Sequence, residues 1–395
     1  MSTLRASYPL VAAGFVISFV LVGGGIDTVG VFINAIARST DWARSALSLA
    51  VSVGAVTGAL TIPMVGVAID RFGVRVPMTV GVVLLAVGFA IVIGMQAPWH
   101  FVAANVFLGA GFAACALLPL TVAIAVRVRE RTALALGIAA AGASAGALVL
   151  APVLQVAVES LVWRGTYVFL GAAVVLTPLP LLLFAVPRGR LAAADPDGAA
   201  PGLPGLAELR RPGVPGLVAL LVLPGLVTFA VSVHLVPLLT DLGLSGRTAA
   251  LALGGTVGIA AVGKIFGGGL ADGFGALQTL RVALLLAAGS FALLAGAASR
   301  PLLACFVALY GMALGTHVAV FPVLARQVLG SERFGTLYGA LQLLALLAAA
   351  VGPVAAGGLY DATGGYTEAI VLWGAAMLLA VLVAAAMRVP ATDGA

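Results

Sequence analysis

Long apolar segments recur along almost the whole length of this 395-residue chain. An α-helix needs roughly 20 mostly apolar residues to cross a lipid bilayer, and twelve segments meet that requirement. They cover residues 8–36, 45–69, 77–96, 99–126, 132–158, 165–187, 213–240, 248–271, 279–298, 301–325, 335–359 and 366–387. Only 9% of the residues are charged, whereas about one quarter are charged in soluble domains. We therefore expect an all-α membrane protein with twelve transmembrane helices, which satisfy their own backbone hydrogen bonds in lipid.

The distribution of basic residues predicts the orientation, because cytoplasmic loops carry an excess of Lys and Arg. With both termini placed inside, 14 basic residues fall on the inner side and 5 on the outer side. The twentieth, Lys264, lies within an apolar segment. Both termini are therefore expected in the cytoplasm, and we expect the protein in the inner membrane of a bacterial cell. The first segment is too long for a signal-peptide core, so we interpret it as a retained helix.

One segment interrupts the apolar pattern. Residues 188–212 are rich in Pro, Gly, Ala and charge and predict a cytoplasmic linker. The linker separates an N-terminal six-helix bundle, 1–187, from a C-terminal one, 213–395. The stretch GVAIDRFG at 66–73 returns 202 positions later as GGLADGFG at 268–275. Each copy follows the second helix of its half, which indicates a parallel internal repeat of the kind found in transporters.

The first copy resembles the loop signature of the major facilitator superfamily. It reads Gly66-x-x-x-Asp70-Arg71-x-Gly73, with Arg75 after it. Other stretches resemble the branch of monocarboxylate porters and oxalate/formate-type antiporters. These are DWARSALSL (41–49), VWRGTYVFLGA (162–172), VHLVPLLTDLGLS (233–245) and GPVAAGGLYD (352–361). The resemblance implies two halves that rock against each other, transport by alternating access, and a small organic anion as substrate.

The resemblance also implies that the two turns form a cytoplasmic gate, whose contacts form when that side closes. Gly73 and Gly275 predict positive φ, while Asp70 and Asp272 predict acceptors for exposed backbone N–H groups or partners for Arg. Plain short turns with interfacial charges are the alternative. The predicted gate comprises Gly66, Asp70, Arg71, Gly73, Arg75, Gly268, Asp272 and Gly275.

Lys264 is a charge within the eighth apolar segment. A central Lys costs about 2.5–3.5 kcal/mol on insertion scales, and such residues usually face a cavity or a partner. In the branch that the chain resembles, a cation here, often Arg, binds the substrate carboxylate. Lys lacks the bidentate geometry of Arg. We expect Lys264 to bind substrate, with a structural ion pair as the alternative.

Asp27 lies in the first apolar segment and is the natural partner of Lys264. It is expected to neutralise Lys264 in the empty site, or to take up a proton because burial raises a carboxyl pKa. An arriving carboxylate would then displace it. The alternative is a carrier for a neutral or cationic solute that Asp27 anchors.

Further polar residues in the apolar segments are weaker candidates. His317, Asn34, Tyr338 and Gln342 are predicted to line the substrate site, and His234 is a second candidate for proton coupling. Each is equally compatible with hydrogen bonds that only hold helices together.

No enzyme signature competes with transport. The chain has no Walker loop, no metal-spaced His/Cys cluster and no Gly-x-Ser-x-Gly. We expect no cofactor, no metal and no nucleotide-driven step, so gradients would drive transport. Scattered Arg residues argue against nucleic acid as a partner. The expected partners are a small carboxylate, the bilayer and protons, and the expected state is a monomer. A membrane receptor that does not transport is the alternative class, but it should carry an additional output domain.

Overall fold

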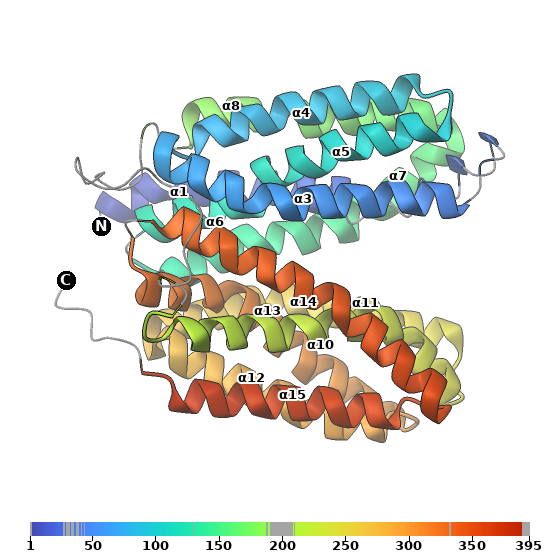
Figure 1. The fold of residues 1–395 in the computed structure, drawn as a ribbon, viewed down its shortest axis with the longest axis vertical. Coiled ribbons are helices and arrows are strands. Elements are labelled where there is room, and N and C mark those ends of the chain that lie inside the picture. Colours follow the sequence, from blue (N-terminus) through green and yellow to red (C-terminus); the bar gives the residue numbers. More distant parts are fainter. Residues whose placement is uncertain are drawn as a thin grey trace. The chain divides into compact units, whose positions relative to one another are not determined.

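The computed structural model describes residues 2–26, 28, 32, 35–36, 39–40, 42, 44–128, 130–186, 189, 208, 210–331 and 333–388. Within these residues the regular secondary structure is helical (Figure 1). The N-terminal part holds α1 (Ser2–Ile17), the π-helix η1 (Ser18–Ile26), α3 (Arg44–Phe72), α4 (Arg75–Gly94), α5 (Pro98–Cys115), α6 (Leu117–Arg127), α7 (Thr132–Leu176) and α8 (Pro178–Phe184). The C-terminal part holds α10 (Val214–Asp241), α11 (Gly246–Phe274), α12 (Ala276–Ala295), α13 (Arg300–Leu329), α14 (Phe334–Thr363) and α15 (Thr367–Ala386).

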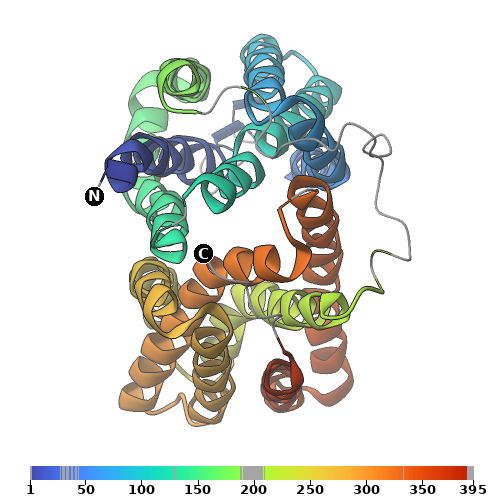
Figure 2. The same cartoon turned by 90° about the vertical axis from the view of Figure 1, so that its left-hand side faces the viewer.

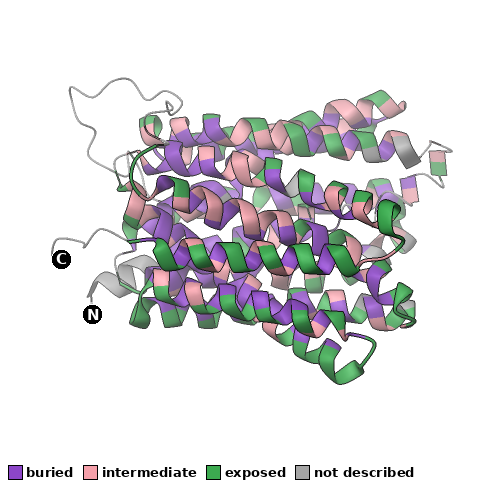
Figure 3. Cartoon of the chain, turned by 60° about the horizontal axis from the view of Figure 1, so that its bottom comes forward, coloured by how far each residue is buried: buried purple, intermediate pink, exposed green. Residues whose placement is uncertain are grey.

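Twelve helical segments in the described part are long and apolar enough to cross a membrane, which confirms the predicted fold class. They are Tyr8–Ile26, Leu49–Phe72, Arg75–Gly94, Pro98–Arg127, Thr132–Val158, Ser160–Leu182, Val214–Asp241, Arg247–Phe274, Ala276–Ala295, Arg300–Leu329, Phe334–Thr363 and Thr367–Ala386. Many residues along the helices are exposed (Figure 3), and large apolar residues are among them. Phe184, Leu148 and Val354 expose 87%, 75% and 75% of their surface. Such surface is unfavourable in water but matches the hydrocarbon of a bilayer.

The internal repeat extends to the helix boundaries. Helices α3 and α11 both have 29 residues, and each bound of α11 lies 202 positions after that of α3. Helix α14 likewise begins 202 positions after α7, and the span 300–329 follows the span 98–127 at the same distance. In the first copy of this last span, Ala116 interrupts the helix with φ −91° and ψ −121°. The sequence repeat is therefore a repeat of whole helices.

The chain divides into two compact units. Unit 1 comprises Met1–Arg129, Ile138–Leu203 and Ser331–Ala340, and unit 2 comprises Glu130–Gly137, Pro204–Gly330 and Leu341–Ala395. The first turns of α7 thus belong to unit 2, and those of α14 to unit 1. Within each unit the helices run side by side, and Figure 2 shows them nearly end-on. In unit 1, α5 packs on α3 and α4; in unit 2, α13 packs on α11 and α12.

Helix α7 carries two membrane spans, and its backbone leaves the helical conformation near the start of the second. Val162 has φ 61° and ψ 156°, a region that is essentially restricted to glycine. The residue 202 positions later is Gly364, which also has a positive φ of 76°. The break therefore occurs in both repeats, but only the second repeat has the residue that adopts it without strain.

Most of the predicted linker, residues 188–212, lies outside the described residues. The predicted boundaries of two six-helix bundles and a linker therefore stay a prediction.

In unit 2 an aromatic cluster ties three helices together. The ring of Phe291 on α12 lies 5.3 Å from that of Tyr310 on α13 and 6.0 Å from that of Trp373 on α15. This cluster fixes the helix that carries His317.

Candidate functional site

Asp70 binds the start of a helix. Its Oδ1 accepts a hydrogen bond from the backbone N–H of Gly335 at 3.0 Å, and its Oδ2 accepts one from Thr336 at 2.6 Å. Both donors lie in the first turn of α14, where N–H groups lack partners inside the helix. A carboxylate there also faces the positive end of the helix dipole. All three residues belong to unit 1, and the charge of Arg333 adds to the attraction.

Asp272 makes the equivalent contact in unit 2. Its Oδ1 and Oδ2 accept hydrogen bonds from the backbone N–H groups of Ala133 and Leu134, both at 2.9 Å. These donors lie in the first turn of α7, which belongs to unit 2. The carboxylate and both donors stand 202 positions from their counterparts in unit 1. Both hydrogen bonds of Asp70 therefore have an equivalent at Asp272.

Glycine makes both contacts sterically possible. A Cβ atom on Gly66 would lie 2.3 Å from the carbonyl oxygen of Gly335, and one on Gly268 would lie 2.4 Å from that of Ala133. The helices can therefore approach closely only because these residues lack a side chain. Gly73 and Gly275 have φ of 81° and 88°, which confirms the predicted positive φ in both turns.

The two arginines of the predicted gate make contacts of their own within unit 1. The Arg71 guanidinium is 5.1 Å from the ring centroid of Phe72. Arg75 donates from Nε to the carbonyl of Val186 at 2.8 Å, which anchors the start of α4 to the end of the sixth span. Arg281 makes a similar anchor in unit 2, donating to the carbonyl of Ala384 at 2.9 Å.

Lys264 is partly buried on α11, and two other helices touch its backbone. A Cβ atom on Gly137 of α7 would lie 2.0 Å from the carbonyl oxygen of Lys264, and one on Gly315 of α13 would lie 2.7 Å from its nitrogen. These contacts, all within unit 2, hold the base of the side chain in place. The counterpart of Lys264 in the first repeat is Ile62, whose carbonyl oxygen lies 3.1 Å from a Cβ atom built on Gly339.

Asp27 and Asn34 lie outside the described residues, and with them the predicted contact between Asp27 and Lys264. The π-helix η1 ends at Ile26. It packs closely on α7, since a Cβ atom on Gly23 would lie 2.5 Å from the carbonyl oxygen of Ala143. Such π-turns are common at functional sites.

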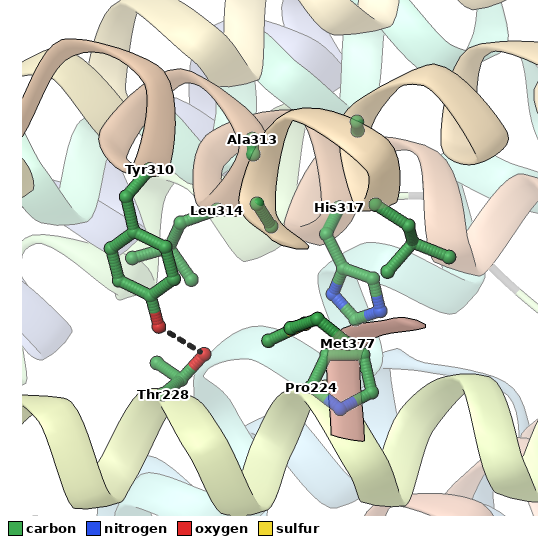
Figure 4. A pocket seen from close by; sticks show the side chains of 10 residues that line it. Pro224, Thr228, Tyr310, Ala313, Leu314, His317 and Met377 are labelled. Carbon is green, nitrogen blue, oxygen red and sulfur yellow. Dashed lines mark hydrogen bonds between the residues drawn. The ribbon is translucent and has the colours of Figure 1, made fainter. Parts of the chain in front are cut away.

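The other predicted substrate residues lie in different surroundings. His317 faces α10, where its Nε2 is 2.8 Å from the carbonyl oxygen of Leu220, and it lines a pocket within unit 2 (Figure 4). Tyr338 is buried in unit 1, with its ring 5.2 Å from that of Phe334. Gln342 is partly buried one turn further along α14.

His234 connects three segments of unit 2. Its Nε2 lies 3.0 Å from the carbonyl oxygen of Pro353, and its Nδ1 lies 3.0 Å from the hydroxyl of Tyr366. A carbonyl only accepts, so Nε2 donates, and in the neutral ring Nδ1 then accepts from Tyr366. Burial, and next the negative charge of Asp241, raise the pKa of Tyr366 above its ordinary value. The phenol therefore remains a donor at neutral pH.

Backbone N–H groups were predicted as possible partners of the two aspartates, and the structure confirms this, but the residues that carry them were not predicted. The donors are the backbone N–H groups of Gly335, Thr336, Ala133 and Leu134, and backbone donors have no side-chain signature. The 202-residue offset could have indicated that the two aspartates have equivalent partners, because the starts of α7 and α14 are separated by the same number of residues. Among the described residues, no three His, Cys, Asp or Glu side chains gather in a way that could hold a metal ion.

Comparison with known proteins agrees with this architecture. Residues 15–345 and 216–394 match the sequence profile of the Major Facilitator Superfamily. The chain is 32% identical to human monocarboxylate transporter 11 over 372 residues, which are 87% of this chain and 73% of the relative. It is 27% identical to mouse monocarboxylate transporter 12 over 365 residues, 84% of this chain and 75% of the relative.

The fold is similar to that of the E. coli fucose:proton symporter, with a TM-score of 0.76, 15% identity and coverage of 98% of this chain and 99% of the other. The profile match spans most of the chain, and the helices repeat across two halves. The chain therefore belongs to the major facilitator superfamily and is an integral membrane secondary transporter, not an enzyme.

Proposed function

We propose that this transporter moves a small organic anion of the monocarboxylate type by alternating access, and that Lys264 binds the carboxylate. One observation carries the proposal. The contact of α11 with α7 repeats that of α3 with α14, including the glycines and the aspartates, but Ile62 in the first repeat is replaced by Lys264 in the second. A cation within a membrane span costs free energy, so the presence of Lys264 where the first repeat has Ile62 supports a role in binding.

The relatives support the choice of solute. Both are named monocarboxylate transporters, and the match to the human protein extends over 87% of this chain. A Lys ammonium suits a carboxylate as a compact point charge, without demanding bidentate geometry. A rigid backbone at Lys264 favours binding, because less conformational freedom is lost when the substrate binds. The close contacts of Gly137 and Gly315 with this backbone hold it in place.

The two aspartate contacts are proposed to break and re-form during transport. Each is a carboxylate bound by two N–H groups at a helix start, an interaction that is favourable only while the two helices touch. Its loss and re-formation would accompany opening and closing of one side of the transporter. With both termini cytoplasmic, as the arginine distribution predicts, that side is the cytoplasmic one.

Proton coupling is assigned to Asp27, which follows η1 directly in the sequence. A carboxyl group near a carboxylate substrate favours protonation, since two like charges disfavour each other. Proton and anion would then move together. Exchange of one anion for another is the alternative coupling, and a neutral or cationic solute held by Asp27 is the alternative substrate.

Uptake into proteoliposomes tests the proposal. Labelled lactate, pyruvate, formate and oxalate would be offered with an inward proton gradient, with internal anion, and with neither. Uptake that depends on the proton gradient supports symport, and uptake that depends on internal anion supports exchange. Failure to take up any carboxylate, in protein that melts cooperatively, would contradict the proposal. Labelled neutral and cationic solutes would be the next probes.

A further inference from the structure

Pro224 lies in the interior of α10 and leaves one carbonyl without its helical donor. A proline has no backbone N–H, so the carbonyl four residues earlier receives no intrahelical hydrogen bond. That carbonyl belongs to Leu220, which is fully buried. The bilayer core offers no water that could replace the missing donor. A donor from a neighbouring helix can satisfy this carbonyl instead.

His317 supplies this donor from a different helix. Its Nε2 on α13 lies 2.8 Å from the carbonyl oxygen of Leu220 on α10. Because a carbonyl can only accept, Nε2 must carry the hydrogen. The contact thus accounts for a histidine at this depth without invoking substrate, since the imidazole satisfies the carbonyl that Pro224 exposes.

The space beside this contact is apolar. Figure 4 shows His317, Pro224 and Met377 around a small pocket, with Tyr310 and Thr228 at its other end. The hydroxyl of Tyr310 donates to Thr228 Oγ1 at 3.4 Å. The remaining lining residues are Ala283, Leu284, Ala287, Ala313 and Leu314. Apart from His317, none of these lining side chains can carry a positive charge that would attract a carboxylate. Kinks in helices commonly occur at proline.

We infer that His317 is a positioning residue, which holds a proline joint in α10 by binding the carbonyl of Leu220. At this turn a side chain of α13 replaces one backbone hydrogen bond of α10. Such a bond can shift while the helix on either side of Pro224 stays intact. This use of the joint in transport rests on the proposed function, whereas the hydrogen-bond role of His317 does not.

The test is a double-mutant cycle between His317 and Pro224. His317→Phe removes the donor. His317→Gln retains an N–H donor of similar reach. Pro224→Ala restores a backbone N–H that bonds to Leu220 within the helix, so it should make His317 dispensable. Pro237→Ala is the matched control, because it changes the other interior proline of α10 without supplying a donor to Leu220.

Two readouts are taken for each purified variant, the apparent melting temperature and the kinetics of uptake. We expect His317→Phe to lower the melting temperature by roughly 5 °C and to reduce the maximal uptake rate with KM unchanged. We expect His317→Gln to retain most of both. In the Pro224→Ala background, His317→Phe should have little further effect, whereas Pro237→Ala should not suppress it.

Equal losses from His317→Phe in both the wild-type and Pro224→Ala backgrounds would overturn the inference. So would a raised KM with an unchanged maximal rate, which would make His317 a substrate ligand. If the wild type takes up no carboxylate, the proposed function fails, but the melting temperatures still decide the inference. If His317→Phe does not fold alone, recovery by Pro224→Ala supports the joint, and a double mutant that also does not fold overturns it.

Discussion

Asp70 and Asp272 stand 202 positions apart, and each carboxylate accepts two backbone hydrogen bonds from the first turn of a helix. The donors for Asp70 start α14, and the donors for Asp272 start α7. The same glycine, four residues before each aspartate, allows both contacts. Duplication of a complete contact, including backbone donors, indicates that the contact itself was retained when the two halves diverged.

The two aspartates should differ in their contribution to stability. Asp70 is partly buried and near Arg333, whereas Asp272 is exposed to solvent. Asp70→Asn removes a charge-assisted contact and should cost about 1–3 kcal/mol, while Asp272→Asn should cost less because water screens it. Melting temperatures of both variants test this order. A larger loss for Asp272→Asn would contradict it.

Strain at Val162 predicts an unusual stabilising substitution. Its φ of 61° and ψ of 156° suit glycine, and a residue held there costs about 1–3 kcal/mol. Val162→Gly should therefore leave the melting temperature unchanged or raise it, although glycine normally destabilises. Gly364→Val, at the equivalent position of the second repeat, should lower it. A marked loss of stability in Val162→Gly would show that the backbone there is not strained.

Close packing around Lys264 predicts a strong effect of one methyl group. Gly137→Ala would place a Cβ atom 2.0 Å from the carbonyl oxygen of Lys264, so α7 and α11 would have to separate. We expect a loss of about 1–3 kcal/mol in stability, the usual range for overpacking, and weaker substrate binding. Gly258→Ala is the control. Gly258 lies on α11, the helix that carries Lys264, and no atom of a neighbouring segment lies within 4 Å of its added Cβ. Equal effects of the two substitutions would contradict the packing argument.

The bond between Tyr366 and His234 predicts a defined pH dependence. Burial and the charge of Asp241 raise the pKa of Tyr366 in the folded protein. A raised folded pKa stabilises the protein fully below the unfolded pKa of about 10, and this contribution is lost as the pH rises through the folded pKa. The melting-temperature difference between wild type and Tyr366→Phe should thus be constant between about pH 7 and 9 and shrink above about pH 10. If the melting-temperature difference were already absent between about pH 7 and 9, the phenol of Tyr366 would not be the donor.

Much of the fold was predictable from the sequence, because apolar length and glycine placement are local signals. The seventh span was expected at 213–240 and is observed at Val214–Asp241. Positive φ at Gly73 and Gly275 followed from the residue type. The gap between the predicted segments 132–158 and 165–187 contains Val162, where the helix is interrupted. The positive φ of Val162 was not predicted, because a β-branched residue normally avoids it.

The site was less predictable, because its bonds join segments distant in sequence. Pro224 indicates that Leu220 lacks a donor, but the identity of that donor depends on the packing of α13 against α10. The prediction that His317 lines the substrate site rested on residue type alone, and it stays a prediction. The bond from His317 to a backbone carbonyl and its place beside a pocket within unit 2 could be seen only in the structure. Lys264 was identified as a candidate substrate ligand from the sequence, because a charge within a membrane span costs free energy. The repeat adds that the equivalent position of the first half is the apolar Ile62.

If Lys264 binds the carboxylate of the substrate, substitutions at this position and at its counterpart in the first repeat should differ in effect. Concentration-dependent uptake of labelled lactate and pyruvate would be measured for wild type, Lys264→Gln, Lys264→Arg and Ile62→Gln. We expect a large rise in KM or loss of uptake for Lys264→Gln and retention of carboxylate uptake by Lys264→Arg. We expect a smaller effect of Ile62→Gln, which places the same amide at the equivalent position of the first repeat. Carboxylate uptake by Lys264→Gln with the wild-type KM would show that Lys264 does not bind the carboxylate.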